Sequence, residues 1–219
     1  MRQRPLFPRW SNSLVATLVV AVVVLLVGLP VLLMVFQRTP LVTGRARPVA
    51  QPIAFDHRHH VGDDGIDCRY CHDLFVRAPT AGMPTTARCL GCHAQIWNES
   101  PLLDALWQSR TEGRPIAWVR VHRLPDFVYF DHSAHVNHGV GCVSCHGRVD
   151  RMARIEQFAP LSMGWCLDCH RNPAPRLRPQ SRITDLVWRP PPGQERGLAS
   201  ALMLAYDVRS LTRCTTCHR

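Results

Sequence analysis

The chain has 219 residues, a formal net charge of +10 and a sequence pI near 9.6. All 26 basic residues are arginine, which excludes any function that needs a lysine side chain as a ligand. Residues 45–219 are short enough to form one domain.

Residues 13–36 read SLVATLVVAVVVLLVGLPVLLMVF and carry no charge. Because about 20 apolar residues cross a hydrocarbon core, this run predicts a transmembrane helix, with a possible kink at Pro30. The alternative is a cleaved signal peptide, which has a shorter apolar core and a small-residue cleavage site. No A-x-A site follows Phe36. We therefore expect residues 1–44 to be a cytoplasmic N-terminus and an uncleaved signal anchor.

Five C-x-x-C-H motifs follow, which we number in chain order: 68–72, 89–93, 142–146, 166–170 and 214–218. This is the attachment signature of a c-type haem, in which two thiols bind the porphyrin vinyl groups and the histidine binds iron. The motifs predict five covalent haem c groups. The expected attachment residues are Cys68, Cys71, Cys89, Cys92, Cys142, Cys145, Cys166, Cys169, Cys214 and Cys217. The expected proximal ligands are His72, His93, His146, His170 and His218.

Zinc sites, redox C-x-x-C pairs and disulfides are the competing interpretations of these cysteines. Histidine makes up 12 of the 219 residues, so five chance C-x-x-C-H matches would occur about once in two million. Zinc ribbons would pair C-x-x-C units two by two, and five is odd. Because haem c is attached outside the cytoplasmic membrane, residues 45–219 are expected on the periplasmic side of the inner membrane.

The charges that flank the apolar run give conflicting indications of its orientation in the membrane. Three arginines precede the apolar run and favour a cytoplasmic N-terminus, and three follow it and weaken that inference. These residues are Arg2, Arg4 and Arg9, and Arg38, Arg45 and Arg47.

The sequence F-D-H-x-x-H occurs twice, at 55–60 and 130–135, shortly before a C-x-x-C-H motif. Each copy is followed by Ala-Pro, a methionine (Met83 or Met163) and a second motif. The chain therefore holds two two-haem modules, about 55–93 and 130–170, and the fifth motif at 214–218 closes it.

Proline is frequent and strand-like alternation is scarce, so we expect a mainly α fold with much irregular loop. Stacked haems would form most of the core of residues 45–219. Ser100 and Pro101 predict a helix start, residues 175–193 an extended strap or tether, and residues 194–213 a helix. About ten haem propionates would neutralise much of the arginine charge, so no nucleic-acid partner is expected.

The F-x-H-x-x-H element resembles that of class III multihaem cytochromes, the c3 and c7 group. The resemblance implies that the first histidine is the sixth ligand of the haem just downstream and the second binds another haem. His57 and His132 would then serve the first and third motifs. His60 and His135 would each reach another haem.

The runs WVRVHRLPDFVYFDHSAHV and PLSMGWCLDCHR further resemble the pentahaem cytochrome subunit of bacterial alternative complex III. That resemblance implies partners: an iron–sulfur/molybdopterin-like subunit, polytopic quinol-binding membrane subunits and a periplasmic monohaem cytochrome or other acceptor. Five irons need five sixth ligands. Together with the count of histidines, the resemblance adds His122 to the four histidines of the F-D-H-x-x-H elements as the last of these ligands. His59 and His138 have no counterpart in the other module, and Met163 is the alternative sixth ligand.

The first functional hypothesis is a membrane-anchored electron-transfer subunit, not catalytic alone, which passes electrons from a quinol-oxidising iron–sulfur complex to a periplasmic acceptor. The second is a free-standing multihaem quinol dehydrogenase that feeds a periplasmic reductase. A catalytic nitrite reductase is disfavoured, because its C-x-x-C-K lysine is absent.

Overall fold

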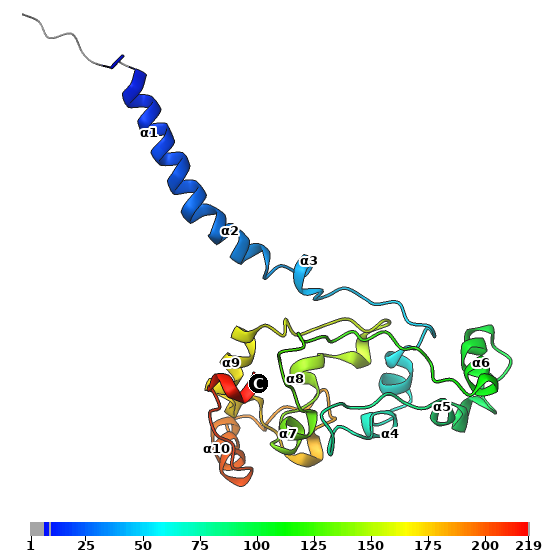
Figure 1. Cartoon of the computed structure of the whole chain (residues 1–219). Helices are drawn as coiled ribbons and strands as arrows, with labels where there is room; N and C mark the ends of the chain where they lie inside the picture. The colour runs from blue at the N-terminus through cyan, green and yellow to red at the C-terminus, as the bar shows by residue number, and fades with distance from the viewer. Residues whose placement is uncertain (1–6, 9, 219) are drawn as a thin grey trace, which may run out of the picture. The chain divides into compact units, whose positions relative to one another are not determined.

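The structure is a computed structural model, and it describes residues 7, 8 and 10–218. The chain divides into two compact units, Met1–Gly44 and Arg45–Arg219 (Figure 1). The expected charges at Arg2, Arg4 and Arg9 lie outside the described residues.

In the first unit, three helical segments run on without a break from Trp10 to Phe36: α1 Trp10–Val23, the π-helical η1 Val24–Gly28 and α2 Leu29–Phe36. None of their residues is buried. Pro30 explains the π register, because it lacks an N–H and its ring collides with the carbonyl one turn earlier, inside η1. The 27-residue helix is long and apolar enough to cross a membrane, as an anchor or as a signal sequence. The short helix α3 Pro40–Thr43 follows.

The second unit consists of short helices joined by irregular loops, and no strand is found among the described residues. Its only β-type pairings there are isolated bridges, Arg45 with Gln157 and Val140 with Leu177. The prediction of a mainly helical, loop-rich fold is therefore confirmed. The helices are η2 Arg58–Asp63, α4 Cys68–Cys71, α5 Thr86–His93, η3 Pro101–Leu103, α6 Asp104–Glu112, α7 His132–Asn137, α8 Val143–His146, η4 Val149–Arg151, α9 Met163–Arg171, η5 Ala174–Arg176, η6 Gln180–Arg182, α10 Glu195–Ala205 and α11 Cys214–Cys217.

The side-chain core of this unit is small and lies in two clusters. One joins α5 and α6, and the other joins α7 to the segment before α10. Eleven apolar side chains are buried among the described residues. The clusters are Ile53, Leu90, Leu103 and Leu106, and Phe75, Val136 and Ile183. A haem-motif cysteine, Cys89 or Cys142, packs at the edge of each cluster. The second and third motifs therefore lie beside these two clusters.

The structure bears on two expectations for the C-terminal part. For residues 175–193 it favours the strap over the tether, the two alternatives that the sequence left open, and the strap is not extended throughout. These residues form a packed strap containing η6, in which Ile183 is fully buried and its carbonyl accepts a hydrogen bond from the Cys142 N–H at 3.1 Å. The helix expected over 194–213 ends at Ala205, because Asp207 has a positive φ of 47° that breaks the helical path.

Candidate haem-binding sites

All five C-x-x-C-H motifs lie in or at the end of a short helix. Helical spacing of three residues puts both thiols of a motif on one face. The histidine that follows is held by the same turn: the backbone N–H of His72, His146 and His218 bonds the carbonyl of its motif's first cysteine at 2.8–2.9 Å. None of the ten cysteines forms a disulfide, and all are at least partly accessible. The thiols are thus free for covalent attachment.

The first and third motifs meet at their cysteines. The thiols of Cys68 and Cys142 lie close enough to shift each other's pKa, which is raised at Cys68 and lowered at Cys142. On the other side of the first motif, burial raises the pKa of Cys71, and the nearby thiol of Cys92 raises it further. The first motif therefore lies between the second and the third.

The third motif lies next to the fourth, and the fourth lies next to the fifth. Burial raises the pKa of Cys145 to about 12, and the charges of Cys169 and Cys166 add to the shift. Burial also raises the pKa of Cys166, and among the thiols the charge of Cys217 adds most to the shift. The motifs thus follow the spatial order second, first, third, fourth, fifth, and Figure 1 shows α5, α4, α8 and α9 in that sequence across the unit.

The two F-D-H-x-x-H elements have the same geometry. Phe55 stacks on His60 with ring centroids 4.3 Å apart, and Phe130 stacks on His135 at 4.4 Å. The aspartate caps the turn that carries both histidines: Asp131 accepts hydrogen bonds from the backbone N–H groups of Ser133 and Ala134. The element is therefore a capped turn in which an aromatic ring fixes the orientation of the second histidine.

Three of the four histidines in these elements face a motif histidine at a common separation. The ring centroids are 6.1 Å apart for His60 and His93, 6.3 Å for His132 and His146, and 6.0 Å for His135 and His170. Two imidazoles bound to opposite sides of one metal ion, with bonds of about 2 Å each, have centroids about 6 Å apart. The fourth, His57, lies near enough to His72 for their charges to interact.

The backbone orients these imidazoles in the manner of metal ligands, which usually donate their second ring N–H to a carbonyl or carboxylate. Nδ1 lies 2.7–3.1 Å from a backbone carbonyl oxygen in six of them. The pairs are His60 with Asp56, His72 with Gly82, His93 with Ile96, His132 with Pro79, His135 with Asp131 and His218 with Phe127. Nε2 is thereby left to face a ligand.

Burial keeps the central histidines neutral, which is the protonation state that binds metals. Burial lowers the pKa of His57 to about 4 and that of His146 to about 3, and it also lowers those of His122 and His135. His57 Nδ1 and His122 Nε2 are buried without a hydrogen-bond partner. Buried polar atoms without a partner are costly unless a ligand completes them, so this donor set fits haem iron.

His122, expected as a further sixth ligand, lies against His146 with ring centroids 4.4 Å apart. For His218, the ring contact in the described part of the chain is with Phe127 at 5.8 Å, and no histidine there pairs with it. Met163 is 68% exposed and begins α9 one turn before Cys166. The structure therefore does not bring His122 and His218 together.

The two unassigned histidines lie on the surface. The His59 side chain is 54% exposed, stacks on Trp97 and lies 3.6 Å from the carboxylates of Asp63 and Asp64. His138 is exposed at the end of α7.

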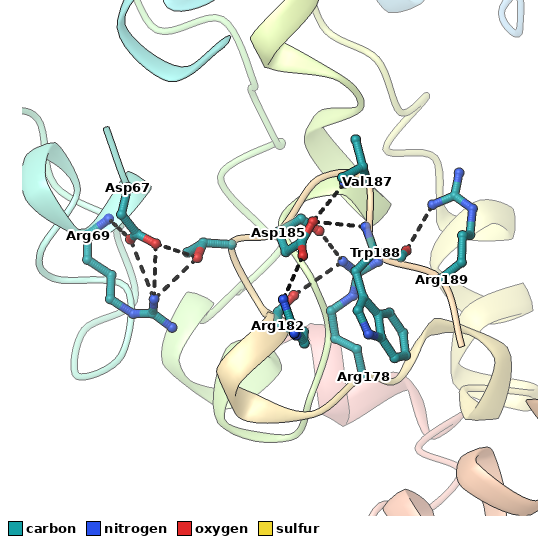
Figure 2. A network of polar contacts seen from close by, with 9 residues as sticks. Asp67, Arg69, Arg178, Arg182, Asp185, Val187, Trp188 and Arg189 are labelled. Carbon is teal, nitrogen blue, oxygen red and sulfur yellow. Dashed lines mark hydrogen bonds and ion pairs between the residues drawn. The ribbon is translucent and has the colours of Figure 1, made fainter. Parts of the chain in front are cut away.

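Sequence reasoning missed the polar network that fastens the strap to the first motif (Figure 2). The hydroxyl of Thr184 donates to the Asp67 carboxylate at 2.7 Å, and Arg69 reaches both. Asp67 also caps α4, which begins at Cys68. More than one hundred residues separate Asp67 from Thr184, so no local pattern connects them.

Comparison with known proteins gives two matches. Residues 128–219 match the family model described as cytochrome c7 and related cytochrome c. A 98-residue stretch is 37% identical to the menaquinone reductase multiheme cytochrome c subunit of Nitratidesulfovibrio vulgaris, and it covers 44% of this chain and 45% of that protein. The matched region thus spans about half the length of the relative. The chain contains a cytochrome c7-like multihaem domain and is homologous to a multihaem subunit of a menaquinone reductase.

Proposed function

We propose that this protein is a membrane-anchored subunit that relays electrons through five covalently bound haem c groups. The observation that carries the proposal is the pairing of motif histidines with the F-D-H-x-x-H histidines at about 6 Å. A haem with two strong protein ligands has no open position for substrate and suits electron transfer. The protein would therefore pass electrons and leave the chemistry of the quinone to its partners.

The ten motif cysteines would hold the haems by thioether bonds, and each motif histidine would bind one iron from the proximal side. His57, His60, His132 and His135 would bind the first, second, third and fourth haems from the distal side. For the fifth haem the sequence leaves His122 and Met163 as candidates, and the position of His122 against His146 of the third motif favours Met163. Haem c supplies one-electron exchange between ferric and ferrous iron. Backbone carbonyls at Nδ1 would hold six of these imidazoles in position, and burial would keep His57 and His146 in the neutral form that binds iron.

The spatial order of the motifs supports a relay whose ends are the second and fifth haems. The contact between Cys68 and Cys142 would join the two modules into one path. Electrons would then enter at one end and leave at the other, since the first, third and fourth motifs each have a neighbour on both sides.

The N-terminal helix would anchor the chain in the cytoplasmic membrane, with the haem domain on the periplasmic side. The partners would be an iron–sulfur/molybdopterin-like subunit, polytopic quinol-binding subunits and a periplasmic cytochrome or other acceptor. If the assembly resembles alternative complex III, electrons would flow from quinol to the acceptor.

The relative from Nitratidesulfovibrio favours a second candidate with the opposite direction, since that protein is named a menaquinone reductase subunit. In this version a periplasmic cytochrome would donate electrons, and the relay would deliver them toward menaquinone. The haem domain and its ligands would serve both directions equally well.

Purification of the untagged protein from its own membranes, followed by identification of the proteins that co-migrate, tests the assembly. A complex with an iron–sulfur protein and polytopic subunits supports the relay, whereas a homomeric cytochrome that oxidises quinol alone would support the free-standing dehydrogenase instead. Incubating the complex with quinol and a ferric cytochrome, then with quinone and a ferrous cytochrome, distinguishes the two directions.

A further inference from the structure

Arg178 is a buried arginine in the strap, with a relative exposure of 6%. One guanidinium nitrogen donates to the backbone carbonyls of Asp185 and Arg182, at 2.7 and 3.3 Å. The guanidinium lies over the ring of Trp188, 5.3 Å from its centroid (Figure 2). Its Nε is buried and has no hydrogen-bond partner.

The positive charge of Arg178 is not neutralised by a contacting carboxylate. Two carbonyl oxygens and an indole ring are neutral partners, and an arginine keeps its proton in proteins. The nearest acid, Asp185, pairs with Arg182 at 3.2 Å and accepts the backbone N–H groups of Val187 and Trp188. Among the described residues no carboxylate lies within ion-pair distance of Arg178. The described residues therefore supply no carboxylate that contacts this buried cation.

This cation lies against the third motif. The backbone N–H of Arg178 donates to the backbone carbonyl of Gly139 at 2.9 Å. This bond holds the strap beside the residues just before Cys142. The guanidinium packs over Gly141, where a Cβ atom would collide with it, so a larger residue there would displace the Arg178 side chain. Gly141 directly precedes Cys142, so the guanidinium lies beside the expected attachment point of the third haem.

We propose that Arg178 sets the reduction potential of the haem attached at Cys142 and Cys145, an inference that rests on the proposed function. Reduction adds one electron from the donor to ferric iron, and no bond or proton changes place. The haem becomes less positive by one charge. A fixed cation in a weakly screened interior favours that less positive form, so Arg178 raises the midpoint potential of this haem. It acts through its charge and does not bind iron.

The test is an equilibrium redox titration of the full-length haem-loaded protein in detergent, with dithionite and mediators, followed by the visible haem absorbance. Arg178→Gln keeps a hydrogen-bond donor for the carbonyls and removes the charge. We expect one of five midpoints to fall and four to stay. Arg178→Lys keeps the charge and should leave that midpoint near its original value. Arg114→Gln removes the charge of an exposed, ion-paired arginine outside the strap; it is the control and should shift none.

Asp185→Asn should shift the same midpoint in the opposite direction. It removes the negative charge of the acid that acts on Arg178, so the midpoint should rise. His132→Met shows which of the five midpoints belongs to the third haem. A methionine ligand should raise the potential of that haem alone. Five unchanged midpoints in Arg178→Gln, or an equal fall in Arg178→Lys, would overturn the proposal. If Arg178→Gln loses haem, Asp185→Asn decides, and an unchanged or lowered midpoint there counts against it. The haem count by mass tests the proposed function separately.

Discussion

The imidazole rings of His135 and His170 lie 6.0 Å apart, although 35 residues separate them, and their planes are inclined by 78°. His135 comes from the turn that also carries His132, whose ring faces His146 of the third motif. One capped turn thus places a histidine opposite the histidine of each of two motifs. The first module repeats the arrangement with His60 and His93. This double use explains why two histidines follow each Phe-Asp pair.

Replacement of His135 by alanine should leave the fourth haem attached through its thioethers but without its distal ligand. We expect one haem of five to change from low spin to high spin, as measured by electron paramagnetic resonance and the visible spectrum. His138→Ala is the matched control, because His138 is exposed and follows directly after the same short helix. A high-spin signal of equal size in the control, or none in His135→Ala, would show that the pairing is not a ligation.

The fifth haem should depend on Met163. No histidine pairs with His218 in the described part of the chain, and Met163 lies one turn before Cys166, which neighbours Cys217. Because methionine ligation raises a haem potential, Met163→Leu should remove one high-potential step from a redox titration while all five haems stay bound.

Met83→Leu, the repeat-related and similarly exposed methionine, is the control for this change and should leave the titration as it was. An unchanged titration in Met163→Leu would instead favour His122 as the fifth distal ligand. In that case His122→Ala should disturb the haem attached at Cys214 and Cys217.

The strap should contribute measurably to stability through Ile183, which is fully buried between Phe75 and Val136. Ile183→Ala should lower the free energy of unfolding by about 2–5 kcal/mol, because it removes buried methyl groups and leaves a cavity. Denaturant unfolding of the haem-loaded protein measures the change. Val187→Ala lies on the same strap but is 59% exposed, and it should cost far less. Equal losses would mean that the strap does not pack as described.

The motifs and the repeat could be read from the sequence because they depend on short spacing. Five C-x-x-C-H units and two F-D-H-x-x-H elements are local patterns, and the helical turns that carry them follow from the same spacing. The mainly helical character was also predictable, since alternation is scarce and proline is frequent. The identical stacking of Phe55 on His60 and of Phe130 on His135 is the structural counterpart of that repeat.

What the sequence could not give depends on contacts between distant segments. The meeting of Cys68 with Cys142, and of Asp67 with Thr184, has no local signature. Residues 175–193 are rich in proline, and their composition does not distinguish a free tether from a strap packed by Ile183 and Arg178. The spatial order of the motifs differs from their chain order for this reason.

The intact mass of the purified chain, with its N-terminus sequenced, tests the central claim most directly, since covalent haems travel with the polypeptide. We expect an uncleaved N-terminus and a mass equal to the polypeptide plus five haems, with no zinc. A chain that begins after Arg38 would contradict the anchor. An excess of only two or three haems would contradict the relay, because some motifs would then carry no cofactor and the path through them would be broken.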